Sequence, residues 1–331
     1  MRNFVAVALT AGILVATGAA RSDAQDKAKN WPTRPLTMVV TFAAGSGDDL
    51  VARIIAPRMA EILGQPVVIE NVGGAGGMNG ASRVARAAPD GYQMVLGGTG
   101  TFAANQTLYK HPLYNAVTDF KPVALVVQQP MVLITANEAP VSNLQEFIAY
   151  AKANQAKMQF GSGGAGSATH LACVLLNLAI GVKVTHVPYR SAVQAIEDMV
   201  GGRINYVCPI TSTAVGQIQG KRLKAIAMLS QTRSPVLPDL PTASEQGLAG
   251  FDAYIWNGIF VPKDTPDEIV KKLHDATVAA MNTAAVDARI RQMAGALVAP
   301  DRRSPQYLRQ FVGDEIKKWA VPIQASGLTM D

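Results

Sequence analysis

The chain has 331 residues, of which 49% are hydrophobic and 16% are charged. At about 150 residues per domain this length predicts two domains, and the low charge excludes a disordered chain. The net charge of +6 comes from 30 basic and 24 acidic residues. No five like charges follow one another, and basic residues do not alternate with aromatic ones, so we expect no nucleic-acid partner.

The first 24 residues have the pattern of a cleavable signal peptide. Arg2 precedes an apolar stretch that begins at Phe4, and small residues then follow. We expect cleavage after Ala24, with Ala20 as the alternative site. The apolar stretch is shorter than the about 20 residues that a bilayer span needs. The sequence therefore predicts export to the periplasm.

The first part of the mature chain alternates short β-branched runs with amphipathic segments. Alternation of this kind predicts parallel sheets with helices on both faces. The expected elements are the strand 36–42, the helix 49–63, the strand 66–70, a helix that ends near residue 88, and the strands 93–97 and 123–127.

The same pattern starts again after residue 127. The expected elements are the strand 131–136, the helix 144–154, the strand 158–160, the helix 168–179, the strand 182–187, the helix 192–201 and the strands 204–207 and 223–229. A strand over 253–261 leads back, and we expect the helices 266–282, 285–294 and 305–326 to pack on the first part. Two crossings, near Val127 and near Ala253, would then join two lobes as a hinge, with the ligand site in the cleft between them.

Three loops rich in glycine and small residues each connect a strand to a helix. They comprise residues 43–48, 73–77 and 161–167. Ligands of open α/β sheets bind at the carboxyl ends of the strands, where unpaired N–H groups at helix N-termini attract anions. A single loop of this kind is also typical of an ordinary tight turn. Three together predict a site for a carboxylate or a phosphate.

Two enzymatic interpretations compete with simple binding. Residues 161–166 match the dinucleotide pattern G-x-G-x-x-G, but residues 181–190 contain no acidic partner for a ribose. Ser167 and His170 form a Ser/His pair near a loop, so a secreted hydrolase or lyase that uses them with an aspartate remains the alternative function. No spacing of cysteine and histidine suggests a metal site, and we expect no cofactor.

Asp48 and Asp49 stand where the first helix begins. We expect one of them to cap the helix by accepting a backbone N–H bond, and the other to face the cleft or solvent. A carboxylate in the cleft would select an amine or hydroxyl on the ligand, because it repels a second carboxylate. Cys173 and Cys208 are the two cysteines, and the sequence leaves open whether they form a disulfide or two buried thiols.

A series of motifs in order resembles the Bug-type periplasmic solute receptors of the tripartite tricarboxylate transporter systems. The first is VTFAAGSGDDLVAR at residues 40–53. The others lie at residues 63–71, 73–77, 89–92, 119–124, 161–171, 186–190, 237–242 and 256–258. The resemblance covers essentially the whole mature chain.

This resemblance implies an α/β, two-lobed, type II periplasmic-binding-protein-like fold with a hinge of two crossing segments. Residues 25–127 and 254–331 would form lobe 1, and residues 128–253 would form lobe 2. The implied function is that of a monomeric receptor, not an enzyme, that captures a small organic carboxylate and delivers it to membrane permease subunits. A membrane sensor kinase is the alternative partner.

In the family, main-chain amides, hydroxyls and waters hold one carboxylate of the ligand. The candidate ligand residues are therefore Phe42, Ala44, Gly45, Ser46 and Asp49 with the adjacent Asp48 in the first lobe, Ser162, Ala165, Gly166, Ser167 and His170 in the second, and Thr99, Thr101, Tyr189 and Thr211 at adjoining strand ends. The chain departs from the family at Asp48, where a small hydroxyl residue is common, and at Pro209, where aspartate is frequent. The identity of the acid therefore cannot be copied from a relative.

Overall fold

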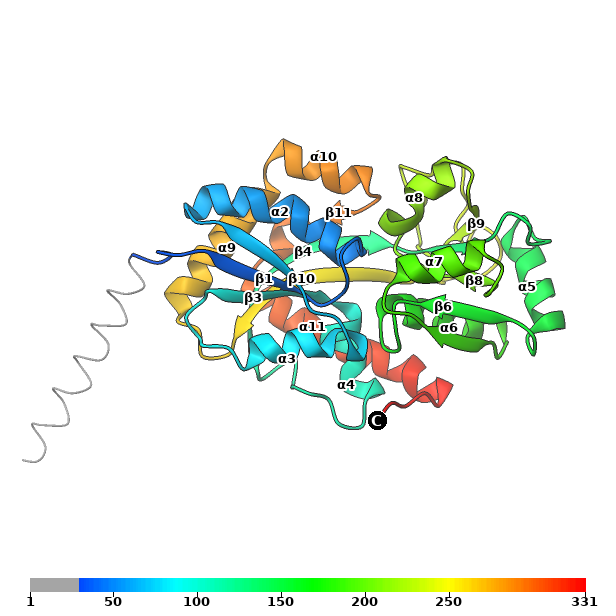
Figure 1. Ribbon diagram of the computed structural model, residues 1–331, viewed down its shortest axis with the longest axis horizontal. Coiled ribbons are helices and arrows are strands. Elements are labelled where there is room, and N and C mark those ends of the chain that lie inside the picture. Colours follow the sequence, from blue (N-terminus) through cyan, green and yellow to red (C-terminus); the bar gives the residue numbers. More distant parts are fainter. Residues whose placement is uncertain (1–29) are drawn as a thin grey trace, which may run out of the picture.

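The computed structural model describes residues 30–331, apart from the side chains of residues 325 and 326, and contains two β-sheets that lie beside each other along the long axis of the molecule (Figure 1). The predicted signal peptide lies outside the described residues. Among the described residues, no helix has the length and apolar character that a membrane span requires.

The first sheet has six strands in the spatial order β11-β4-β10-β3-β1-β2. The strands are β1 (Leu36–Val40), β2 (Val67–Asn71), β3 (Gln93–Gly98), β4 (Phe120–Pro130), β10 (Tyr254–Pro262) and β11 (Ala296–Leu297). β1 pairs in parallel with β2 and β3, whereas β10 is antiparallel to β3 and β4. β1 is almost completely buried, which is typical of a strand with helices on both faces.

The second sheet has five strands in the order β7-β6-β8-β5-β9. They are β5 (Val132–Thr135), β6 (Gln159–Ser162), β7 (Thr185–Pro188), β8 (Tyr206–Val207) and β9 (Lys224–Met228). β6 is parallel to β7 and β8, but β5 is antiparallel to β8 and β9.

The expectation of parallel sheets is thus wrong for the strands that join the two sheets. β4 carries the chain out of the first sheet, and a single residue, Met131, separates it from β5 in the second sheet. β10 brings the chain back and pairs with β4 along its whole length, with Tyr254 opposite Pro130. An outgoing and a returning strand that lie side by side must run in opposite directions.

Helices surround both sheets. The first unit comprises the six-stranded sheet with η1 (Ala75–Gly77), η2 (Thr99–Ala104), η3 (Pro300–Arg302), α2 (Gly47–Leu63), α3 (Met78–Ala85), α4 (Asn105–Leu108), α9 (Asp267–Met281), α10 (Ala284–Gln292) and α11 (Pro305–Ser326). The second unit comprises the five-stranded sheet with α5 (Leu144–Asn154), α6 (Ala168–Ile180), α7 (Ala192–Val200) and α8 (Thr211–Gln219). As expected, the C-terminal helices α9, α10 and α11 pack on the first unit.

The predicted helices 144–154 and 305–326 are confirmed at both ends. The sequence analysis missed α8 and the consecutive helices η2 and α4. α8 contains threonine, valine and glycine, and η2 is a π-helix with threonine and glycine at its start. These residues have low intrinsic helix propensity, so packing against the rest of the fold decides their conformation.

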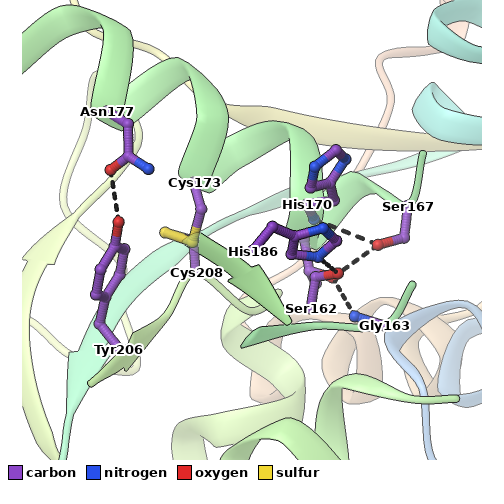
Figure 2. Close-up of a disulfide and its surroundings, with 10 residues drawn as sticks. Ser162, Gly163, Ser167, His170, Cys173, Asn177, His186, Tyr206 and Cys208 are labelled. Atoms are coloured by element: carbon purple, nitrogen blue, oxygen red, sulfur yellow. Dashed lines mark hydrogen bonds between the residues drawn. A yellow bond between two sulfur atoms is a disulfide. The ribbon is translucent and has the colours of Figure 1, made fainter. Parts of the chain in front are cut away.

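Cys173 of α6 and Cys208, directly after β8, form a disulfide with their Cα atoms 5.5 Å apart (Figure 2). One turn further along α6, Asn177 accepts a hydrogen bond from the Tyr206 hydroxyl at 2.6 Å. The question that the sequence left open is therefore resolved in favour of a disulfide. The bond ties α6 to the centre of the second sheet.

Candidate functional site

Four helix N-termini meet at one small cavity between the two units. Residues at the starts of α2, α6, α7 and α8 line a volume of about 40 Å³. The lining residues are Phe42, Ser46, Gly47 and Asp48 from the first unit, and Gly163, Ser167, Ala168, Thr169, Ser191, Ala192, Ile210 and Thr213 from the second. The first N–H groups of a helix have no partner within the helix, and the helix dipole is positive there. The arrangement is suited to an anionic group.

A larger cleft adjoins this cavity. It has a volume of about 690 Å³ and includes the loop 73–77, Tyr109, Ala165, Tyr189 and Arg190 in its lining. Phe42 and Gly163 line both spaces, so the two lie next to each other at these residues. A ligand that occupied both spaces would pass between Phe42 and Gly163.

Ser46, not an aspartate, caps α2. Its backbone is extended, and its Oγ accepts a hydrogen bond from the backbone N–H of Asp49 at 3.3 Å. The expectation that Asp48 or Asp49 caps the helix is therefore wrong. The serine precedes the helix by one residue, which is where a side-chain oxygen reaches the N–H three positions on.

Asp49 instead holds the first loop in shape. Its carboxylate accepts hydrogen bonds from the Gly45 N–H and Arg53 Nε, both at 2.9 Å, and from Asn71 Nδ2 at 3.0 Å. Asn71 also donates to the Phe42 carbonyl. Burial alone would raise the pKa of Asp49, but these hydrogen bonds outweigh it and lower the pKa. The protein thus uses this carboxylate to position Gly45, whose φ of 81° lies in the left-handed region that glycine adopts readily.

Asp48 lies in the cavity wall and is 5% exposed. Its Oδ1 accepts a hydrogen bond from Asn257 Nδ2 at 2.9 Å. Burial raises the pKa of Asp48 to about 6, a rise that the Asn257 bond reduces and the nearby Asp49 charge increases. A carboxyl group therefore sits among helix termini that attract anions.

The loop 161–167 is organised by the side chains around it (Figure 2). The Gly163 N–H donates to Thr169 Oγ1 at 2.8 Å, and Ser167 Oγ lies 2.9 Å from the same oxygen. Ser162 Oγ is 2.7 Å from His186 Nε2. Ser167 caps α6 through the His170 backbone N–H. These contacts fix the loop at the edge of the cavity.

The geometry does not form a nucleophile and base from Ser167 and His170. The His170 imidazole accepts the Gly166 N–H at its Nδ1, at 3.2 Å, and the hydroxyl of Ser167 bonds to Thr169 instead. Within residues 30–331, no group of histidine, cysteine, aspartate and glutamate side chains is arranged to hold a metal ion.

Seven of the predicted ligand residues line one of the two spaces. These are Phe42, Ala44, Ser46, Asp48, Ala165, Ser167 and Tyr189. The other eight, which line neither, are Gly45, Asp49, Thr99, Thr101, Ser162, Gly166, His170 and Thr211. Several of these side chains make hydrogen bonds within the protein. Thr99 Oγ1 accepts the Trp256 N–H, Thr101 Oγ1 contacts Thr41, and the Thr211 hydroxyl donates to the Pro130 carbonyl.

The sequence analysis missed the contributions of α7 and α8. Ser191 caps α7 by accepting the Gln194 N–H, and Thr213 belongs to the first turn of α8. A serine one residue before an apolar helical pattern was the available signal for Ser191. No comparable signal precedes α8, because Ile210 occupies its cap position.

Two buried histidines lead us to expect that the protein loses stability as the pH falls. The His170 and His186 rings stack with centroids 4.1 Å apart. Burial lowers the pKa of His170 to about 3, with a further contribution from His186, and burial lowers the pKa of His186 to about 4. Below pH 6.5 the unfolded chain takes up protons that the folded chain excludes. We therefore expect the free energy of unfolding to fall between pH 6.5 and 5, with a slope for each histidine that steepens toward about 1.4 kcal/mol per pH unit near pH 5.

Asp48 acts in the opposite direction over this range, because its raised pKa lets the folded chain bind a proton first. The destabilising contribution of the two histidines is larger than the stabilising contribution of the one aspartate, so the free energy of unfolding falls overall. Urea unfolding at several pH values measures it, with His186→Gln as the comparison. A slope that is the same in both proteins would contradict this prediction.

Comparison with known proteins shows which family the chain belongs to. Residues 51–328 match the family model described as tripartite tricarboxylate transporter family receptor. The chain belongs to this receptor family. A UPF0065 protein from the TAR-I ttuE-ttuC' intergenic region of Agrobacterium vitis is 37% identical over 98% of this chain and 92% of its own length.

Two solved structures are also similar to this chain. MatC from Rhodopseudomonas palustris with bound malate is 38% identical, with a TM-score of 0.85 over 88% of this chain and all of MatC. The periplasmic binding protein BugD is 37% identical, with a TM-score of 0.87 over 91% of this chain and all of BugD. The expected Bug-type family and the α/β fold of these receptors are thereby confirmed.

Proposed function

We propose that this chain is a periplasmic receptor that captures a small organic carboxylate between two lobes and delivers it to membrane permease subunits. The single observation that supports this most directly is the meeting of four helix N-termini at one small cavity. Among the described residues, no lysine or arginine lines that cavity. A carboxylate there would be held by uncharged N–H and O–H donors.

The proposal includes the two-lobed organisation. In this proposal the described residues 30–127 and 254–331 belong to lobe 1 and residues 128–253 belong to lobe 2. The paired strands β4 and β10 would be the crossing strands. The cavity has walls from both units, so closure of the lobes creates contacts that the open form lacks. Such differential contacts shift the population toward the closed form when ligand binds.

The relatives support the class of ligand and the location. MatC holds malate in its solved structure, and BugD is described as a periplasmic binding protein. The signal pattern at residues 1–24 agrees with export. Charge-assisted hydrogen bonds contribute about 1.5–3 kcal/mol each, so a few of them account for micromolar binding of about −8 kcal/mol.

The test is a thermal-shift and calorimetric screen of small mono-, di- and hydroxycarboxylates against the mature chain. We expect at least one acid to bind with a dissociation constant in the micromolar range and to be recovered chemically unchanged, as measured by NMR after overnight incubation. Consumption of the acid would favour the hydrolase or lyase alternative. Absence of binding by every acid would contradict the receptor proposal.

A further inference from the structure

Asp48 is the one ionisable side chain in the wall of the small cavity, among the described residues. One of its carboxylate oxygens, Oδ1, accepts the hydrogen bond from Asn257. No hydrogen bond within the described part of the chain reaches the other oxygen, Oδ2. An acceptor is therefore available beside the helix termini.

A series of hydrogen bonds, buried at Gln129 and Asn257, fixes the orientation of Asp48. Asn257 Oδ1 accepts from Gln129 Nε2 at 3.0 Å, and Gln129 Oε1 accepts from Ser212 Oγ at 3.1 Å. Gln129 and Asn257 are 0% and 1% exposed. Because each amide oxygen already accepts a bond, the Asn257 amino group is directed at Asp48. These hydrogen bonds thus link Ser212 of α8 to Asp48 of α2 through both crossing strands.

The position of Asp48 limits what can lie next to it. A ligand carboxylate bound at the helix N-termini leaves room for only a few more atoms in a cavity of about 40 Å³. A second carboxylate in this space would be repelled by Asp48, and an apolar group would leave Oδ2 without a partner. Buried acceptors without a donor destabilise a complex. A hydrogen-bond donor on the ligand satisfies both requirements.

We propose that Asp48 is a specificity-determining residue, and that it selects small carboxylates with a hydroxyl or ammonium group close to the bound carboxyl group. This inference rests on the proposed function. The remainder of the ligand extends past Phe42 and Gly163 into the larger cleft.

Two matched series of acids test the inference by calorimetry at pH 7.5. The first is succinate, malate and aspartate, and the second is propionate, lactate and alanine. Within each series only the substituent beside the carboxyl group changes, from hydrogen to hydroxyl to ammonium. We expect the wild type to bind a hydroxyl or ammonium member at least about tenfold more tightly than the unsubstituted acid in one series. The preferred member identifies the donor.

Asp48→Asn is the test variant, because its side-chain oxygen still accepts from Asn257 while an amino group replaces Oδ2. In this variant we expect the ratio of the two dissociation constants, unsubstituted acid to substituted acid, to fall to about one. Asp90→Asn is the matched control, since Asp90 is an exposed carboxylate paired with Arg34 outside both spaces, and it should keep the preference of the wild type.

A preference that Asp48→Asn retains would overturn the inference, as would a wild type that binds all members of a series equally. The second result is measured on the wild type alone, so the inference can be tested even if Asp48→Asn does not fold. Both results leave the receptor proposal intact. Failure of every acid to bind the wild type and the Asp90→Asn control would instead overturn the receptor proposal, and this inference with it.

Discussion

Gly100→Ala is expected to weaken ligand binding about 10- to 100-fold while the protein stays folded. A Cβ atom at Gly100 would lie 2.6 Å from the carbonyl oxygen of Gly166, which belongs to the second unit. Overpacking of this kind costs about 1–3 kcal/mol. Because the two atoms belong to different units, the substitution destabilises the form in which the units are close together. Gly100 does not have a positive φ, so alanine introduces no backbone strain of its own.

The contact at Gly100 belongs to a wider region where backbone meets backbone between the units. Gly76 is close to the carbonyl oxygen of Ala165, and the Tyr109 hydroxyl donates to the same oxygen at 3.4 Å. Side chains at the glycine positions would hold the two loops apart. Gly76 has a φ of 61°, so its substitution would also strain the backbone, and Gly100 gives the cleaner experiment.

Calorimetry with the acid identified in the screen measures the affinity, and small-angle X-ray scattering measures compaction on binding. Gly313→Ala is the matched control, because nothing lies within 4 Å of a Cβ at that position in α11. The control should bind and compact like the wild type. Equal affinity of Gly100→Ala and the wild type would show that this contact is not part of the closed, ligand-bound form.

Removal of the disulfide is expected to have the largest effect on stability. Cys173 and Cys208 are separated by 35 residues, and a cross-link over a loop of this length stabilises by about 3–4 kcal/mol, mainly by restricting the unfolded chain. The double variant Cys173→Ala/Cys208→Ala should therefore unfold at a markedly lower urea concentration. Its ligand affinity should change little, because neither cysteine lines the cavity.

Reduction of the wild type provides an independent check. We expect dithiothreitol to lower the midpoint of urea unfolding of the wild type toward that of the double variant, and to leave the double variant unchanged. A reduced wild type that unfolds at the same urea concentration as the oxidised protein would contradict the stabilising role of the bond.

The proposed site would hold an anion with few charges of its own. Asp49 and Asn71 shape the first loop, Thr169 and His186 shape the loop 161–167, and serines cap three of the four helices. In the proposed site, backbone N–H groups at the helix N-termini would be the donors, and the fold sets their positions. Such preorganised donors need little rearrangement on binding. Asp48 adds the one ionisable acceptor in this cavity, within the described residues.

The sequence alone determined most of the helices and strands and the three loops between them. Local patterns sufficed for this, because helical spacing of apolar residues and glycines at strand ends are short-range signals. They also predicted the return of the chain at residues 253–261, which the structure has as β10.

Only the tertiary structure decided how those parts meet. The pairing of Cys173 with Cys208, the antiparallel course of β10 beside β4, and the bond between Asp48 and Asn257, 209 positions apart, depend on residues that are distant in sequence. The same is true of α8, whose residues favour a helix only weakly by themselves. Local propensity carries no information about such distant partners, and it is these partners that bring four helix N-termini and one carboxylate into a single cavity.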